Sequence, residues 1–432
     1  MHSADVADRL NVRYFGGRLA PAVADRLRLL PMDRDDVRAF IERMCRTMEA
    51  AEFPATDFSV LQAEILAALL SRLLPGNWEG RVPPITVAGR HARLDTLVGH
   101  TAAAEGLPRS FIDVACGFPP LTTIDTATTL SDWQVIGVDR SLPAYLVDDG
   151  VGNYAVYDAE GTATYFQPLV PSGERWAALL TDWEQSRRRF ETLLADMLAA
   201  RTRAGGGNRI EMNGATLEVD PALSHSHDRL RFVRADLGQA DVPPAAVVRC
   251  FNMLMYFNRA FRHEALTQLA ALLEDDGLLV CGSDWTYTTE ARYFTFRKRD
   301  GHLADGEFVF SLDNLAPVSI LPWYTMNDDD LEIERLVEMT RRLRTDRAFI
   351  DRFMTRSDAL RVETGLIPRG PDGYYVSDLA DMSQADLWLR SSRYSEALSH
   401  EFGKAAVTAL RAQGLDARRN VVGHVAIAVP VE

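Results

Sequence analysis

The 432-residue chain has only four cysteines, no long apolar run and no excess of basic residues. Four cysteines are too few for a disulfide framework, and none stands at metal-ligand spacing. No run reaches the roughly 18 apolar residues that a membrane-spanning helix needs. The formal net charge of −14 argues against binding to nucleic-acid phosphates, which requires a basic surface. We therefore expect neither nucleic acid nor a membrane as a partner.

The N-terminal residues also lack the apolar stretch of a secretory signal, so we expect a cytoplasmic protein. A hydrophobic content of 47% and a charged content of 25% are typical of globular proteins. The length suits two or three domains. No pattern in the sequence specifies an oligomeric state.

Hydrophobic periodicity changes near residue 109. Apolar positions in residues 1–108 recur at helical spacing, so we predict a helical N-terminal cap region there. From 109 to 432, short apolar runs alternate with helical segments. This pattern is typical of βαβ units, and it predicts an α/β fold with a mostly parallel sheet buried on both faces.

Two insertions interrupt the α/β pattern, at 141–229 and 285–394. The first contains two hairpin-like segments, and Asn213-Gly214 in the second of them is a strong signal for a type I′ turn. The second insertion begins with a predicted hairpin at 292–312 and continues with helices. We expect both insertions to form lid and acceptor-site elements.

Ligands of open α/β sheets bind outside the carboxyl ends of the strands, so the residues there are the first candidates for a site. In chain order, the candidates at the five predicted strand ends are Asp113, Ala115, Gly117, Asp139, Asp236, Leu237, Asn252, Tyr256 and Asp284. Asp139 lies 22 residues after Gly117 and ends the second strand. A carboxylate at that spacing suits binding of ribose hydroxyls by charge-assisted hydrogen bonds. The structural alternative for Asp139 and Asp236 is helix capping.

Three segments resemble, in order, the motifs of class I S-adenosylmethionine-dependent methyltransferases. They are FIDVACGFPP at 111–120, WQVIGVDRS at 133–141 and RFVRADL at 231–237. The resemblance spans about 109–140, 230–284 and 395–432. It implies a Rossmann-like, mostly parallel seven-stranded sheet with helices on both faces.

The resemblance also implies roles for individual residues in cofactor binding. Asp113 matches the acid of the first motif and Gly117 its central glycine, and Asp139 would bind the ribose. The third motif would place Asp236 and Leu237 beside the adenine. The cofactor-binding set implied by the motifs and strand ends is Asp113, Ala115, Gly117, Asp139, Arg140, Asp236, Leu237 and Asn252. Ala115 and Pro119 replace two glycines of the first motif, and Pro119 removes an N–H donor. Adenosylmethionine has no phosphate, so it tolerates a glycine-poor loop better than a nicotinamide dinucleotide does.

The segment VVRCFNMLMYFNR at 247–259 also resembles the fourth-strand segment of chemotaxis-receptor methyltransferases, which esterify protein glutamates. Asn252 and Tyr256 are among the matching positions, and Phe251 replaces an arginine of that family. The resemblance keeps a protein acceptor open as an alternative.

These features together predict an S-adenosylmethionine-dependent methyltransferase that releases S-adenosylhomocysteine and acts on a small-molecule or peptide-sized acceptor. The predicted catalytic residues are Asn252, Tyr256 and Asp284. The alternatives are a protein carboxyl methyltransferase, a cofactor-binding protein without catalysis and, least favoured, a nicotinamide oxidoreductase.

Several other residues have both a functional and a structural interpretation. His225 and His227 lack a clear third ligand, so we expect a surface loop and no metal. Arg90 and Arg93 are candidates for the methionine carboxylate, but a solvated helix face is the favoured interpretation. For His424, and for the aromatic residues of 154–166, we expect structural packing.

Overall fold

The computed structural model describes residues 3–63, 86–168, 183–285, 288–319, 323–375 and 382–430. The chain forms two compact units. The first unit comprises Met1–Ala67, Gly89–Val114 and Asp241–Glu432, and the second comprises Ala68–Ala88 and Ala115–Ala240. The expected division at 108–109 does not coincide with these units, since the N-terminal helices group with the C-terminal half of the chain.

Nine strands form one large mixed sheet. Their order is β13-β14-β12-β11-β10-β9-β1-β2-β8. In chain order their bounds are β1 (Ser110–Val114), β2 (Gln134–Val138), β8 (Leu230–Val233), β9 (Ala245–Phe251), β10 (Leu273–Asp284), β11 (Ala291–Arg299), β12 (His302–Phe310), β13 (Ala417–Arg419) and β14 (Val425–Ala428). Pairs β2–β8, β1–β9 and β9–β10 are parallel, as the apolar runs predict. The pairs from β10 to β13 are antiparallel.

The α/β class is confirmed, but the predicted count of seven strands is wrong. The hairpin predicted at 292–312 forms as β11 and β12, and it does not stand apart as a lid element. It pairs with β10 on one side and with β14 on the other, and so extends the sheet. Phe294 and Phe308 face each other across this hairpin with ring centroids 5.3 Å apart, so burial of aromatic side chains favours its place in the sheet.

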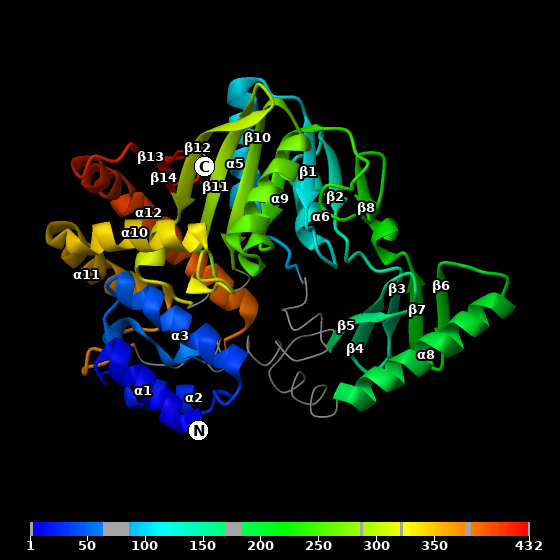
Figure 1. Ribbon diagram of the computed structural model, residues 1–432, viewed down its shortest axis with the longest axis horizontal. Helices are drawn as coiled ribbons and strands as arrows, with labels where there is room; N and C mark the ends of the chain where they lie inside the picture. Colours follow the sequence, from blue (N-terminus) through cyan, green and yellow to red (C-terminus); the bar gives the residue numbers. More distant parts are fainter. Residues whose placement is uncertain are drawn as a thin grey trace. The chain divides into compact units, whose positions relative to one another are not determined.

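Helices surround the first unit's part of the sheet. In Figure 1, α9 (Arg259–Ala271) lies in front of β9 and β10, and α5 (Ala92–Glu105) lies behind the strands. Asn258 caps α9, because its Oδ1 accepts the backbone N–H of Phe261 at 3.0 Å. The remaining long helices of this unit are α1 (Ser3–Phe15), α2 (Pro21–Arg28), α3 (Asp35–Ala50), α10 (Leu331–Thr345), α11 (Arg347–Thr364) and α12 (Gln384–Ala412).

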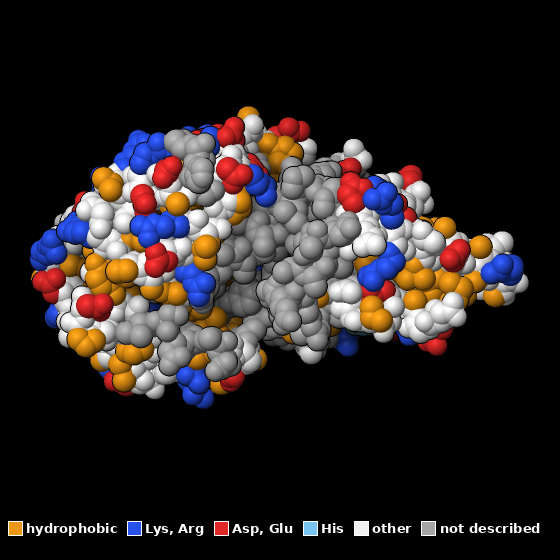
Figure 2. Space-filling model, turned by 90° about the horizontal axis from the view of Figure 1, so that it is seen from below, with side chains coloured by type: hydrophobic (Ala, Val, Ile, Leu, Met, Phe, Trp, Pro, Cys, Tyr) orange, Lys and Arg blue, Asp and Glu red, His pale blue; other side chains and the backbone are white. Residues whose placement is uncertain are grey.

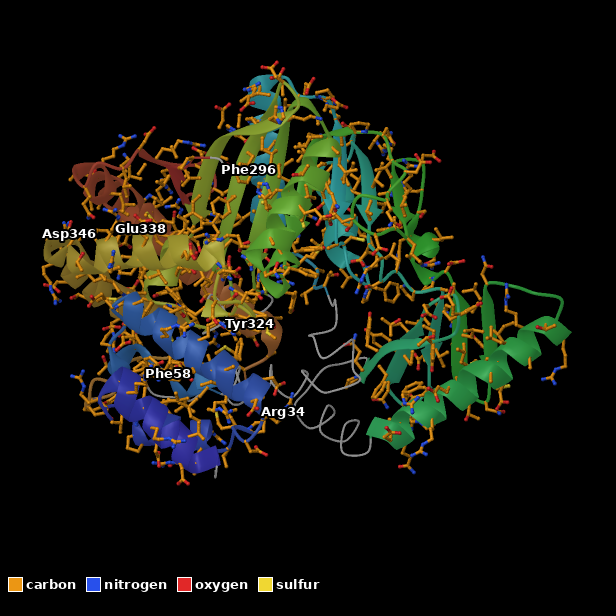
Figure 3. All side chains as sticks on the ribbon, viewed as in Figure 1. Arg34, Phe58, Phe296, Tyr324, Glu338 and Asp346 are labelled. Atoms are coloured by element: carbon orange, nitrogen blue, oxygen red, sulfur yellow. The ribbon has the colours of Figure 1, made fainter. Side chains whose placement is uncertain are left out.

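The predicted N-terminal helices form where the apolar spacing places them. The buried face of α3 consists of Val37, Phe40, Ile41, Met44, Cys45 and Met48. Phe40 packs on Tyr324, labelled in Figure 3, with ring centroids 5.1 Å apart. Much of the helix expected after residue 56 lies outside the described residues.

The second unit contains a separate antiparallel sheet in the order β5-β4-β3-β7-β6. Its strands are β3 (Tyr145–Asp148), β4 (Asn153–Tyr157), β5 (Ala163–Pro168), β6 (Arg209–Met212) and β7 (Ala215–Val219). The helix α8 (Trp183–Arg203) covers it and contributes Phe190, Leu194 and Met197 to a shared core. Both hairpins predicted in 141–229 are present. Asn213 and Gly214 have φ of +51° and +83°, which confirms the predicted turn.

The second unit also carries the short helix α6 (Leu121–Thr129), which follows the turn after β1. Figure 2 shows acidic and basic side chains interspersed with hydrophobic ones over the described surface of one face. Among the residues that the structure describes, no helix is both long and apolar enough to cross a membrane.

Candidate functional site

Asp139 follows β2 and closes the turn after β1. Its Oδ2 accepts the backbone N–H of Gly117 at 2.9 Å, and its Oδ1 accepts the backbone N–H of Ser141 at 2.6 Å. A carboxylate offers about four lone-pair sites, so each oxygen can accept a further hydrogen bond. The structure therefore brings Gly117 and Asp139 together as the sequence predicts.

The turn after β1 has a backbone that few residues adopt. Ala115 and Gly117 have φ of +60° and +69°, in the left-handed region. The backbone N–H groups of Ala115 and Cys116 both donate to the carbonyl of Val138, at 2.7 and 3.3 Å. Because a left-handed alanine is costly, the surrounding hydrogen bonds must hold it in place, as is common near ligand sites.

Burial dominates the electrostatics of Asp139. The residue is only 8% exposed, and burial raises the pKa of its carboxyl group. The hydrogen bonds from Ser141 and Gly117 and the charge of Arg140 oppose this shift without cancelling it. Arg140 itself is exposed and acts here as a nearby charge.

Tyr165 is a residue that the sequence analysis did not place in the site. It lies in β5, and its hydroxyl donates to the carbonyl of Phe118 in the turn after β1, at 3.1 Å. Its ring also packs edge-on to Tyr154, with centroids 6.5 Å apart. The aromatic residues of 154–166 therefore do more than pack a hairpin, since one of them holds the turn beside Asp139.

Asp113, which the sequence analysis assigns to cofactor binding, has its carboxylate against an arginine in the core. Its Oδ1 and Oδ2 accept from Nε and Nη2 of Arg249 at 2.9 and 2.7 Å. Nη1 of Arg249 donates to Asp95 at 2.8 Å, and all three side chains are at most 3% exposed. The Arg249 guanidinium on β9 offsets the charge of Asp113 on β1, and this allows the three side chains to be buried in the core.

Asn252 and Asp284, at the ends of β9 and β10, hold each other in place. Nδ2 of Asn252 donates to Oδ1 of Asp284 at 2.9 Å, and the Asp284 backbone N–H donates to Oδ1 of Asn252 at 3.1 Å. Asn252 has a φ of +57°, which asparagine tolerates better than most residues. This pair confirms that the two strand ends meet.

Arg90 and His91 complete the surroundings of Asp284. Nε of Arg90 donates to Oδ1 of Asp284 at 2.7 Å, and Nη2 donates to its carbonyl at 2.6 Å. Nε2 of His91 lies 3.3 Å from Oδ2 of Asp284. The side chain of Arg90 is only 9% exposed, so the expectation of a solvated helix face is wrong for this residue.

Asp284 remains ionised in this environment. Burial by itself would raise the pKa of its carboxyl group, but the charges of His91 and Arg90 and the hydrogen bonds from His91 and Asn252 lower it below its usual range. A carboxylate with a lowered pKa is a poor general base. Asp284 is therefore suited to accepting hydrogen bonds and orienting its neighbours.

The other predicted site residues are more peripheral. Asp236 is exposed and lies three residues beyond the end of β8, and Leu237 is half-buried. Tyr256 is half-buried in a short 3₁₀ helix (Leu254–Tyr256), with its ring edge-on to Tyr324. His225 and His227 are exposed, and the described part of the chain holds no cluster of three or more metal-ligating side chains.

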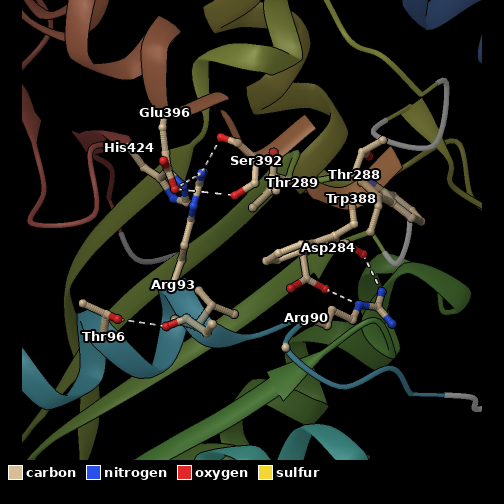
Figure 4. A pocket seen from close by; sticks show the side chains of 15 residues that line it. Arg90, Arg93, Thr96, Asp284, Thr288, Thr289, Trp388, Ser392, Glu396 and His424 are labelled. Atoms are coloured by element: carbon tan, nitrogen blue, oxygen red, sulfur yellow. Dashed lines mark hydrogen bonds and ion pairs between the residues drawn. The ribbon is translucent and has the colours of Figure 1, made fainter. Parts of the chain in front are cut away.

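The first unit contains a pocket of about 190 Å³ beside Asp284. Figure 4 shows Arg90 and Asp284 on one side of it, and Arg93, Glu396 and His424 on the other. Its remaining lining residues are Gly89, Ala92, Leu94, Thr96, Trp285, Thr288, Thr289, Ala291, Trp388 and Ser392. Residues of the second insertion, 285–394, therefore supply much of the wall.

No protein-family model and no curated protein sequence matches this chain. Comparison with solved structures finds methyltransferases at low similarity. Magnesium protoporphyrin IX methyltransferase from Synechocystis PCC 6803 is 15% identical, with 45% of this chain and 55% of that one covered and a TM-score of 0.21. DesVI of Streptomyces venezuelae is 12% identical, with 52% and 70% covered and a TM-score of 0.22.

A putative protein-L-isoaspartate O-methyltransferase from Plasmodium falciparum is 13% identical, with 72% of this chain and 95% of that one covered and a TM-score of 0.23. Several matched structures contain the cofactor or its product, including the Synechocystis and Plasmodium enzymes with bound S-adenosylhomocysteine. This chain spans only about half the length of the Synechocystis enzyme. Because the TM-scores are this low, the activity is inferred below from the geometry of the site and not from these matches.

Proposed function

We propose that this protein is an S-adenosylmethionine-dependent methyltransferase that acts on a small-molecule or peptide-sized acceptor. The observation that carries the proposal is the 2.9 Å hydrogen bond from the Gly117 backbone to Asp139. It places a left-handed glycine turn after one strand beside an acid at the end of the next strand, which are the two features that α/β sheets use to bind the adenosine part of a cofactor.

The residues of the second unit fit the adenosine part of this cofactor. Asp139 retains acceptor sites on both carboxylate oxygens, which suits the two hydroxyls of a ribose. Gly117 has no side chain to obstruct a ligand at the turn, and Tyr165 fixes the turn from β5. When bound, the cofactor supplies an activated methyl group. We assign Asp236 and Leu237 to the adenine and leave Asp113 out of the binding set.

The first unit's pocket is our candidate for the acceptor site. Asp284 lines this pocket, and Asn252 and Arg90 hold its carboxylate in place. Their role is to position an acceptor and exclude water, since the lowered pKa of Asp284 does not suit proton abstraction. We keep Tyr256 as a candidate acceptor contact.

The insertion at 141–229 is our candidate for a lid. Tyr165 links its sheet directly to the turn after β1. Movement of this sheet would therefore displace the turn whose Gly117 N–H bonds to Asp139. Because the strands of 154–166 belong to a folded core, a point change at Tyr165 tests the link better than a deletion would.

Calorimetry with S-adenosylhomocysteine and with NAD tests the cofactor. We expect binding of S-adenosylhomocysteine and none of NAD, and the opposite result would favour a nicotinamide oxidoreductase. Incubation with methyl-labelled S-adenosylmethionine and cell extract then tests the reaction. Label in small molecules supports the proposal, label in protein as base-labile ester indicates a carboxyl methyltransferase, and binding without transfer to any fraction indicates a cofactor-binding protein without catalysis.

A further inference from the structure

His424 lines the pocket of the first unit, and a tight turn fixes its position just before β14. The backbone N–H groups of Val422 and His424 both donate to Oδ1 of Asn420, at 3.2 and 2.9 Å. Gly423 completes the turn with a φ of +85°. Because Oδ1 of Asn420 accepts two backbone donors, its Nδ2 must be the side that faces Tyr293.

This orientation determines the tautomer of His424. Nδ2 of Asn420 donates to the Tyr293 hydroxyl at 3.1 Å, and that hydroxyl lies 3.2 Å from Nδ1 of His424. If the Tyr293 hydroxyl donates its own proton to Nδ1, the Nδ2 of Asn420, the Tyr293 hydroxyl and Nδ1 of His424 all have partners, and of these groups Nε2 alone is left without one. The opposite tautomer would leave the Tyr293 proton without an acceptor, which is costly in the core. Neutral His424 therefore carries its proton on Nε2.

The Nε2–H of His424 has no acceptor among the residues that the structure describes. The residue is only 2% exposed, and burial followed by the charge of Arg93 lowers its pKa to about 3, while the charge of Asp284 opposes the shift. The imidazole is thus uncharged at any physiological pH. A buried donor without an acceptor, at the wall of a pocket, indicates a place for a ligand atom that accepts a hydrogen bond.

Each charged group at the pocket has a partner of opposite charge. Arg90 binds Asp284 at 2.7 Å, and Arg93 lies 3.5 Å from Glu396 while donating to Oγ of Ser395 at 2.9 Å. A charged ligand would therefore enter without a free counter-ion among these groups. The pocket favours an uncharged molecule.

The size and lining of the pocket point to a single ring. A cavity of about 150 Å³ is known to hold benzene, so a pocket of about 190 Å³ has room for one ring with a small substituent. The indoles of Trp285 and Trp388 and the side chains of Leu94 and Ala291 provide apolar walls. Flat aromatic walls favour a flat ligand.

We propose that this pocket binds an uncharged, single-ring aromatic compound through a carbonyl oxygen that accepts the Nε2–H of His424. Only the naming of this compound as the methyl acceptor rests on the proposed function. The binding itself does not, since it involves residues of the first unit and the predicted cofactor contact Asp139 belongs to the second. Tyr293 and Asn420 act through His424 and are positioning residues.

A matched set of probes tests the proposal on the full-length protein. Acetophenone and ethylbenzene differ in one carbonyl oxygen, and benzoate adds a negative charge. Calorimetry should show acetophenone binding about 5- to 10-fold more tightly than ethylbenzene, as expected for one hydrogen bond to a buried donor. Benzoate should bind more weakly than acetophenone.

Two variants locate the effect at the imidazole. His424→Phe keeps a ring but removes the donor, so it should abolish the preference for acetophenone over ethylbenzene. Tyr293→Phe removes the proton that selects the tautomer, so it should reduce the preference while leaving the imidazole in place. Thr340→Val is the control, since Thr340 does not line the pocket and its buried hydroxyl, unlike that of Tyr293, has no partner in the described structure.

Nitrogen-15 spectra of the histidine side chains give a second readout that does not depend on affinities, with the His424 signals assigned by their loss in His424→Phe. We expect the signals of an Nε2-protonated ring for His424 and a change in the Nε2–H resonance on adding acetophenone. An Nδ1-protonated ring, equal affinity for acetophenone and ethylbenzene, or no probe binding at all would overturn the proposal. S-adenosylhomocysteine binding is measured separately, so a failure of the cofactor assignment is distinguishable from a failure here.

Discussion

Asp113 in β1 and Asp139 directly after β2 are held in opposite ways. In the first unit, both oxygens of Asp113 bond to the guanidinium of Arg249. In the second unit, the oxygens of Asp139 accept from the backbone N–H groups of Gly117 and Ser141. The carboxylate of Asp113 is occupied on both oxygens by one guanidinium and serves the fold, whereas Asp139, held by backbone amides, keeps part of its acceptor capacity for a ligand.

The arginine clamp recurs within the first unit. Arg262 binds Asp330 at 2.6 Å, and Arg344 binds Asp57 at 2.7 Å, in both cases with the acid nearly buried. Such pairs explain how a chain with many acidic residues can bury several of them. They also explain why a strand-end acid is a weak indication of a ligand site until its partner is known.

Removing the clamp should have the largest effect. Arg249→Met leaves Asp113 and Asp95 buried without their shared cation, so we expect the free energy of unfolding to fall by about 3–5 kcal/mol. Chemical denaturation monitored by circular dichroism measures it. Arg356→Met is the control, because its ion pairs with Glu363 and Glu401 lie at the surface and should matter by at most about 1 kcal/mol. Equal losses in the two variants would contradict the comparison.

Asp139→Ala should weaken S-adenosylhomocysteine binding without unfolding the protein. Loss of one charge-assisted hydrogen bond is worth roughly 1.5–3 kcal/mol, or about a 10- to 100-fold loss of affinity by calorimetry. The affinity of Asp139→Asn should lie between those of the wild type and Asp139→Ala, because asparagine keeps the shape of the side chain and loses its charge. Asp275→Ala, at an exposed position on β10, should leave affinity unchanged. Wild-type affinity in a folded Asp139→Ala protein would refute the cofactor site.

Glu290 is a buried acid of the first unit that backbone amides hold, as they hold Asp139. Its Oε1 accepts from the backbone N–H groups of Val318 and Ser319 at 2.9 and 3.2 Å. Burial, followed by the charge of Asp313, raises its pKa from the ordinary 4.5 to about 8. Between these values the folded protein holds a proton that the unfolded chain has released, so stability should fall as pH rises from about 4.5 to 8.

Glu290→Gln should flatten that slope, since glutamine keeps the acceptor and does not ionise. We expect the variant to be more stable than the wild type at pH 9, by on the order of 1 kcal/mol. Thermal melting across pH 5 to 9 measures the difference. An unchanged slope would show that burial and the charge of Asp313 do not raise the pKa of Glu290 above the opposing effect of its backbone hydrogen bonds.

Tyr165→Phe should have the smallest effect. It removes the hydroxyl that donates to the Phe118 carbonyl, so affinity for S-adenosylhomocysteine should fall about 3- to 10-fold, the value of one neutral hydrogen bond. Tyr157→Phe is a matched control, since its buried hydroxyl has no partner within the described ranges. If both variants bind alike, the link between β5 and the turn does not serve the cofactor site.

Local sequence determined the elements whose causes lie within a few residues. Apolar spacing predicted the buried face of α3 and strands β1, β2, β9 and β10. Asn258 predicted the start of α9, and Asn213-Gly214 predicted the turn between β6 and β7. The proximity of Asp139 and Gly117 was also predictable, because each follows one of the two parallel strands of a single βαβ unit.

Tertiary structure alone decided which candidate residues a ligand can reach. Arg249 reaches Asp113 across 136 positions of the chain, and the Tyr293 hydroxyl reaches His424 across 131. Neither pairing leaves a periodic or motif signal, since each depends on which strands become neighbours. The same is true of the β11–β12 hairpin, whose sequence specifies a hairpin but not its place in the large sheet. Short-range backbone preferences depend on each residue and its near neighbours in the chain, whereas the partner of a buried charge is set only when distant segments pack together.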